Sequence, residues 1–162
     1  MNPIQAKKWL NPITIAAGFG FLKGALLARG HRMAPGKEFY AGIVAPMVEE
    51  AMFRAIPFKM AEITGAKPPN GATAFSFAAE HIRQEGWSGG HSVWRFGEVF
   101  FGGILYEQAY KKWGWFGSVG AHSLHNIMVS VGSFLSGALF GFPVHTLNHQ
   151  KRKRTRRLKL KR

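Results

Sequence analysis

The sequence predicts an all-α protein, a bundle of about four to five transmembrane helices around a buried polar site. Three observations predict this fold class. The 162 residues include 20 Gly, 14 Phe and 5 Trp, and small residues combined with bulky aromatic rings are common in membrane helices. Clusters of Gly, Pro and charged residues divide the chain into apolar segments of helical length. No segment shows the strict alternation of a half-buried strand.

Five helices are expected, at about 12–29, 38–63, 71–84, 93–112 and 116–142. The breaks between them include "GHRMAPGK", "GAKPPNGA" and "RQEGWSGGHSV". A bilayer-spanning helix needs roughly 20 residues, so the second, fourth and fifth segments are expected to span. The third is shorter and is expected to be re-entrant or buried among the others. The first contains Lys23 and lacks a clean cleavage site, which favours a retained helix over a signal peptide.

The charge of the chain is concentrated at its C-terminal end. The net charge is +14, and the final twelve residues, "KRKRTRRLKLKR", hold nine of the 22 basic side chains. We therefore divide the chain into a helical membrane domain, 1–150, and a basic tail, 151–162. The tail is expected to contact phosphates of anionic lipid or nucleic acid, through Lys151, Arg152, Lys153, Arg154, Arg156 and Arg157. An integral membrane protein is therefore expected, and the positive-inside rule predicts that this tail lies in the cytoplasm.

The chemistry of any active site is limited by composition. The chain has no Cys, which excludes disulfides, thiolate metal sites and cysteine nucleophiles. All eight acidic residues are Glu, so any carboxylate chemistry must use Glu.

Three charges lie within the apolar second segment, in "VEEAMFR". Glu50 and Arg54 are four residues apart and share a helix face, so they are expected to pair, while Glu49 points about 100° away. Pro46 removes one helical hydrogen bond and is expected to distort the helix beside this pair. A charge inside a membrane segment is costly, which favours a functional role over a purely structural ion pair. Glu49 is the candidate general base.

Two further segments carry polar residues at helical spacing. In the third, Phe77 and His81 lie one turn apart, and in the fifth His122 and Asn126 share one face. Two donors aimed at one point are what an oxyanion hole requires.

These motifs, Glu49-Glu50-x-x-x-Arg54, Phe77-x-x-x-His81 and His122-x-x-x-Asn126, resemble those of the CPBP family of CAAX-protease and bacteriocin-processing (Abi) intramembrane proteases. Their order and spacing match, and the resemblance covers about residues 39–135. Glu80, where the family usually has an apolar or small residue, and His125, a second imidazole beside Asn126, depart from the pattern.

The resemblance implies a metal-independent glutamate peptidase that needs no cofactor and acts within a lipid bilayer on a peptide or protein, which in this family can be prenylated. By position, Glu49 and His81 would activate the attacking water. Glu50 and Arg54 would orient the site, and His122 with Asn126 would stabilise the oxyanion.

Two alternatives stay open from the residues. One is a zinc-dependent membrane peptidase, because Glu49, His81 and His122 form the two-His, one-Glu set of catalytic zinc sites. The other is a non-catalytic membrane or assembly protein, of a virion or nucleoprotein, whose basic tail binds nucleic acid.

Overall fold

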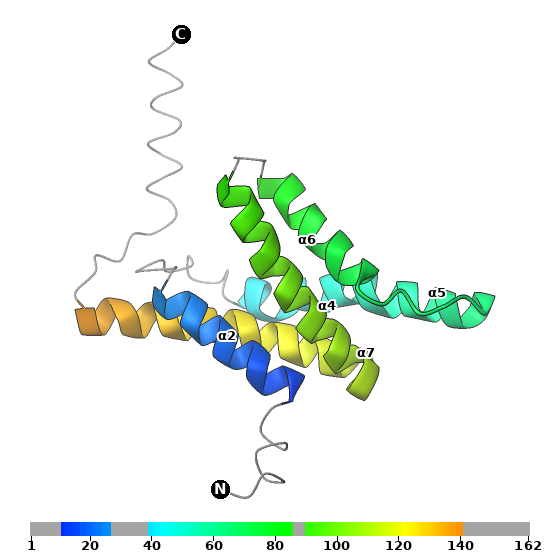
Figure 1. The fold of residues 1–162 in the computed structure, drawn as a ribbon. Coiled ribbons are helices and arrows are strands. Elements are labelled where there is room, and N and C mark those ends of the chain that lie inside the picture. Colours follow the sequence, from blue (N-terminus) through cyan, green and yellow to red (C-terminus); the bar gives the residue numbers. More distant parts are fainter. Residues whose placement is uncertain (1–10, 27–38, 86–89, 141–162) are drawn as a thin grey trace, which may run out of the picture.

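The computed structural model describes residues 11–26, 39–85 and 90–140 (Figure 1). Within these ranges the chain is helical and contains no strand, which confirms the all-α prediction. The first helix is α2 (Pro12–Leu26), and α6 (Ala72–Glu85) is the third predicted segment. Residues 27–29, 38 and 141–142, which we expected to be helical, lie outside the described ranges.

The second predicted segment is continuously helical but changes its hydrogen-bond pattern along its length. It runs through η1 (Tyr40–Val44), α4 (Ala45–Glu50), η2 (Ala51–Ala55) and α5 (Ile56–Thr64), where η1 and η2 are π-helical. Each π-helical turn ends two residues before a proline, Pro46 or Pro57. Proline lacks an N–H and its ring clashes with the carbonyl one turn earlier, and a π-bulge is one way for a helix to accommodate such a break. The expected distortion at Pro46 is therefore present.

The fourth and fifth predicted helices form one long element, α7 (Gly90–Phe140), interrupted at Gly114. Gly114 has φ 68° and ψ −162°, a conformation that is essentially restricted to glycine. The interruption falls in the predicted break between 112 and 116, although the first arm begins at residue 90 rather than 93. The two arms of α7 have different directions in Figure 1.

The ends of the helices are held by specific groups. The Asn11 side-chain oxygen accepts hydrogen bonds from the backbone N–H groups of Ile13 and Thr14, at 2.9 and 3.0 Å, and so caps α2. At the start of α6, the buried Glu107 carboxylate accepts from the Gly71 N–H at 3.1 Å and from the Thr73 hydroxyl at 2.6 Å. This acid satisfies free donors of α6 and ties that helix to the first arm of α7.

The α2 helix packs closely against the second arm of α7, drawn in yellow and orange in Figure 1. Glycines make this contact possible. A Cβ at Gly20 would collide with the His125 carbonyl, one at Gly24 with the Val129 carbonyl, and one at Gly132 with the Phe21 carbonyl. Close backbone approach through small residues is the usual way for helices to pack without large side chains between them.

The membrane-spanning part of the fold prediction is not met by the described helices. None of those in 11–26, 39–85 and 90–140 combines the length and the mean hydropathy of a bilayer span. The α2 helix has only 15 residues, the first arm of α7 carries charged residues such as Glu98 and Glu107, and in the second arm polar residues such as His122, His125 and Asn126 lower the mean hydropathy.

Candidate functional site

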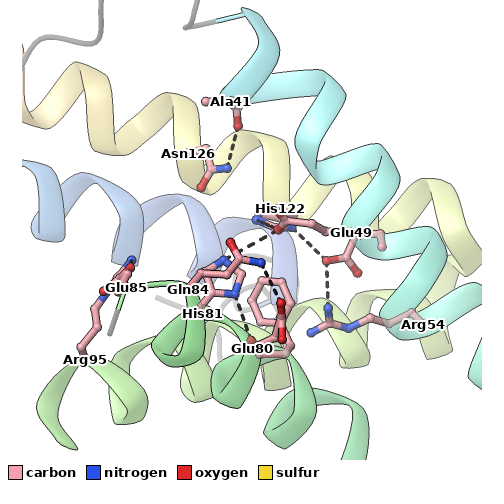
Figure 2. A network of polar contacts seen from close by, with 12 residues as sticks. Ala41, Glu49, Arg54, Glu80, His81, Gln84, Glu85, Arg95, His122 and Asn126 are labelled. Carbon is pink, nitrogen blue, oxygen red and sulfur yellow. Dashed lines mark hydrogen bonds and ion pairs between the residues drawn. The ribbon is translucent and has the colours of Figure 1, made fainter. Parts of the chain in front are cut away.

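The three motifs of the sequence meet in the interior of the bundle. Glu49 and Glu50 end α4, Arg54 lies in η2, and His81 and His122 come from α6 and the second arm of α7 (Figure 2). The π-helical turn η2 begins directly after Glu50 and contains Arg54, so the change in helical pattern falls within this motif.

Glu50, Arg54 and His122 form a buried network. The side chains of Glu50 and Arg54 are fully buried, and Arg54 Nη1 donates to Glu50 Oε1 at 3.1 Å, so the predicted ion pair is present. His122 Nδ1 lies 2.9 Å from the same oxygen, and Arg54 Nη2 donates to the Gly103 carbonyl at 3.0 Å. The guanidinium also lies 4.5 Å from the centre of the Phe77 ring, a cation–π contact. Glu50 is thereby held between two donors from different elements.

Glu49 has a different environment, as the sequence predicts. Its side chain is 30% exposed, and its Oε2 atom lies 3.9 Å from His81 Nε2 and 3.7 Å from His122 Nε2. These distances are too long for direct hydrogen bonds. Polar atoms at such separations are the kind that a water molecule bridges. One carboxylate oxygen thus faces two imidazole nitrogens across gaps of similar length.

His81 is oriented by its own helix. Its Nδ1 lies 2.9 Å from the Phe77 carbonyl oxygen, and the two rings are 4.3 Å apart, so the predicted contact between them is present. A carbonyl oxygen can only accept, which means that Nδ1 carries the hydrogen. In the neutral ring Nε2 is therefore an acceptor, and it faces Glu49.

Asn126 connects the second arm of α7 to η1. Its Nδ2 donates to the Ala41 carbonyl at 2.9 Å, a contact visible in Figure 2. This bond uses one of the two N–H groups of the carboxamide.

A cavity of about 60 Å³ lies beside these groups. His81, His122 and Asn126 all line it, together with Lys23, Phe77, Arg95, Glu98, Val99, Gly102, Tyr106 and His125. A buried water needs roughly 10–15 Å³ of such space, so the cavity has room for about four waters. The structure thus brings His81, His122 and Asn126 to one space, with Glu49 facing the two imidazoles.

Several lining residues were not singled out from the sequence. Tyr106 is buried and stacks on His122 with ring centres 4.3 Å apart. Lys23 bonds to Glu98 at 2.5 Å, and Arg95 pairs with both Glu98, at 2.8 Å, and Glu85, at 2.9 Å. Lys23 could have been identified from the sequence, because a single charged residue in an apolar segment indicates that it pairs with a buried partner.

An apolar groove of about 710 Å³ adjoins this cavity between α2 and the first arm of α7. Its wall is formed by Phe19, Leu22, Leu26, Val93, Trp94, Gly97 and Phe101. Lys23 and Glu98 line both spaces, so their ion pair separates the groove from the polar cavity.

Glu80, the first departure from the family pattern, does not join the site. It accepts hydrogen bonds from Arg83 at 2.6 and 2.7 Å and from Gln84 at 2.9 Å on the outer side of α6. These bonds, above all those from Arg83, lower the pKa of Glu80 to about 2. Its charge is balanced on its own helix.

The zinc alternative finds no support in the described ranges, where no group of three His or Glu side chains has an arrangement suited to a metal ion. The candidate phosphate contacts of the basic tail, from Lys151 to Arg157, lie outside the residues that the structure describes.

Comparison with known proteins agrees with this geometry. A family model described as type II CAAX prenyl endopeptidase Rce1-like matches residues 37–128, which contain Glu49, Glu50, Arg54, His81 and both members of the His122–Asn126 motif. No curated protein and no solved structure matches the chain. The matched region is more than half of the chain, and the protein therefore belongs to the Rce1-like family of type II CAAX prenyl endopeptidases.

Proposed function

We propose that this protein is a glutamate-type endopeptidase that hydrolyses a peptide bond in the cavity beside Glu49. The observation that carries the proposal is the position of Glu49 Oε2, 3.9 Å from His81 Nε2 and 3.7 Å from His122 Nε2. The family match supports the same class of reaction.

The first step is activation of water. A water between Glu49 and His81 donates one hydrogen to the carboxylate and one to Nε2, because both of these atoms are acceptors when His81 is neutral. Glu49 then takes a proton as the water oxygen attacks the carbonyl carbon of the substrate. The partial exposure of Glu49 gives water a route to this position.

The second step is stabilisation of the tetrahedral oxyanion. His122 donates through Nδ1 to the Glu50 carboxylate, so it donates through Nε2 as well only when the ring carries both hydrogens. The Glu50 carboxylate orients the ring of His122, as the buried aspartate orients the histidine of a Ser-His-Asp triad. The free N–H of Asn126 supplies a second donor from the same wall of the cavity.

The last step is cleavage. The proton on Glu49 passes to the nitrogen of the scissile bond, the C–N bond breaks, and the products are a carboxylic acid and an amine. Glu50 and Arg54 contribute by holding His122 and by keeping the wall of the cavity in place.

The substrate is expected to be a protein or peptide, and the apolar groove beside the cavity suits an attached prenyl chain. The groove of about 710 Å³ is lined almost entirely by apolar side chains and shares Lys23 and Glu98 with the polar cavity. A substrate could therefore place its lipid in the groove and its peptide bond beside Glu49.

We also propose that the protein works in a lipid bilayer. Large apolar side chains are exposed on every part of the bundle, for example Leu22 (56%), Met52 (58%) and Phe116 (80%). So much exposed apolar surface is unusual for a protein surrounded by water and suits contact with lipid.

The reaction can be tested with a peptide library, in both prenylated and unmodified forms, incubated with the protein in liposomes. Glu49→Gln is expected to abolish cleavage while the helical circular dichroism spectrum and the unfolding midpoint stay unchanged. Glu80→Gln is the matched control, because this acid lies on α6 next to His81 but bonds to Arg83. Cleavage by the Glu49→Gln protein at the wild-type rate would refute the mechanism.

A further inference from the structure

His125, the second departure from the family pattern, lines the same cavity as His81 and His122. It is 5% exposed and lies three residues after His122, so both project from one side of α7. Its ring contacts Phe19 of α2 at 5.4 Å between ring centres and Tyr106 of α7 at 6.1 Å. Contacts on these two sides hold the imidazole in one orientation.

The hydrogen bond of His125 determines which of its nitrogens can accept. Nδ1 lies 3.1 Å from the Ala16 carbonyl oxygen on α2, and a carbonyl can only accept, so Nδ1 carries the hydrogen. In the neutral ring Nε2 then has a free lone pair. Nε2 makes no hydrogen bond to any residue in the described ranges.

The surroundings of His125 keep its ring neutral. The charged and titratable groups lining the cavity with it include Lys23, Arg95, Glu98 and the imidazoles of His81 and His122. Glu98, the carboxylate among the described residues that line this cavity, is engaged by Lys23 and Arg95. Burial of the ring, with a smaller contribution from the charge of Lys23, lowers the pKa of His125 to about 4.

A peptide bound in this cavity needs an acceptor as well as donors. Its carbonyl oxygen faces His122 and Asn126 in the mechanism proposed above. A peptide also has an N–H group, and burying that group without an acceptor is unfavourable. Glu98 is occupied by two cations, and His81 Nε2 is used by the attacking water. Nε2 of His125 is a further acceptor in this cavity, and it makes no hydrogen bond to a described residue.

We infer that His125 is a substrate-binding residue whose Nε2 accepts a hydrogen bond from a backbone N–H group of the substrate. This inference rests on the proposed peptidase function and adds to it a contact that orients the peptide. The contact recognises the peptide backbone and not any particular side chain, so it favours an extended segment with a free N–H next to the cleaved bond.

Two substitutions distinguish the roles of the two ring nitrogens of His125. In His125→Asn the side-chain amide N–H occupies the place of Nδ1 and keeps the bond to Ala16, but the acceptor at Nε2 is lost. In His125→Gln the longer side chain brings an amide oxygen to the place of Nε2, while the bond to Ala16 is lost. If His125 has a purely structural role, His125→Gln should lower kcat/KM more than His125→Asn. If His125 binds the substrate, His125→Asn should lower kcat/KM more.

The experiment compares these variants on a cleaved peptide and on versions that are N-methylated at one backbone nitrogen at a time. For one nitrogen, methylation is expected to lower kcat/KM about tenfold with the wild-type protein and to have no further effect with His125→Asn. A tenfold change corresponds to about 1.4 kcal/mol, which is within the range of one hydrogen bond. His125→Asn alone should lower kcat/KM by a similar factor at an unchanged unfolding midpoint, and His125→Gln should stay within about threefold of wild type.

The inference is overturned if His125→Asn cleaves the unmethylated peptide with the kcat/KM of the wild-type protein. It is also overturned if methylation at every position lowers kcat/KM by the same factor in His125→Asn as in the wild-type protein. Failure of the wild-type protein to cleave any peptide would count against the proposed function instead. In that case the inference is decided by fluorescence anisotropy with the library peptide that Glu49→Gln binds most tightly. Adding His125→Asn should raise its Kd about tenfold, and an unchanged Kd would refute the contact.

Discussion

Glu50 and His122 are 72 residues apart in the sequence, yet His122 Nδ1 lies 2.9 Å from Glu50 Oε1. Glu50 is fully buried, and the same oxygen accepts a hydrogen bond from Arg54. The bond therefore links the end of α4 to the second arm of α7 at the point where His122 enters the cavity. Its strength depends on the charge of Glu50, which Arg54 balances.

Arg54→Ala is expected to cost about 3–5 kcal/mol of the free energy of unfolding, because it leaves the Glu50 carboxylate buried without its main counter-charge. Cleavage should be lost as well. The measurement is denaturant unfolding of the variant beside the wild-type protein. The double variant Glu50→Leu/Arg54→Leu should regain most of the lost stability, because neither charge of the pair is left buried. It should have no activity. A loss below 1 kcal/mol in Arg54→Ala would contradict this account.

Gly24→Ala is expected to weaken the packing of α2 on α7, by about 1–3 kcal/mol, because the added Cβ meets the Val129 carbonyl. Gly18→Ala serves as the control, since a Cβ there has nothing within 4 Å. This control should be neutral or stabilising by up to about 1 kcal/mol, from the higher helix propensity of alanine. Thermal unfolding followed by circular dichroism measures both, and equal midpoints would show that α2 does not pack in this way.

Gly114→Ala is expected to destabilise the fold by about 1–3 kcal/mol, because the backbone at this position is restricted to glycine. No neighbouring atom lies within 4 Å of the added Cβ, so the cost comes from conformation and not from a clash. Gly120→Ala, which also has open space around it but lies inside the helix, should be neutral or stabilising. Unfolding midpoints that move equally in both variants would exclude a sharp break in α7.

Trp94→Ala is expected to reduce the apolar surface of the groove between α2 and α7. If the groove holds a prenyl chain, kcat/KM should fall for a prenylated peptide by about tenfold and stay unchanged for the same peptide without the lipid. Phe116→Ala is the control, since Phe116 is 80% exposed and does not line the groove. An equal effect of Trp94→Ala on both peptides would show that the lipid binds elsewhere.

Removal of metal ions is expected to leave cleavage unchanged, because water activation is assigned to Glu49 and His81. The measurement is activity after dialysis against a chelator, together with the zinc content of the purified protein. Zinc present in stoichiometric amount and lost together with activity would instead support Glu49, His81 and His122 as ligands.

Much of the helical architecture could be predicted because it depends on local patterns. Gly, Pro and charge clusters marked the breaks, including the one at Gly114, and helical spacing paired Glu50 with Arg54 and Phe77 with His81. Segment length, however, was a poor guide to bilayer spans, since none of the described helices is apolar enough along its length. A window of 20 residues shows how long a helix is, but polar residues within it, such as His122 and Asn126, lower its mean hydropathy.

The sequence by itself determined the helix order, the chemistry available to the site and the motifs that identify the family, because residue type and spacing are properties of the local chain. Only the tertiary structure decided that Glu50 binds His122, that Glu49 faces two imidazoles, and that Lys23 and His125 line the same cavity. These contacts join residues of separate helices. They depend on the close approach of α2 and α7 and on the change of direction at Gly114, which no local pattern can specify.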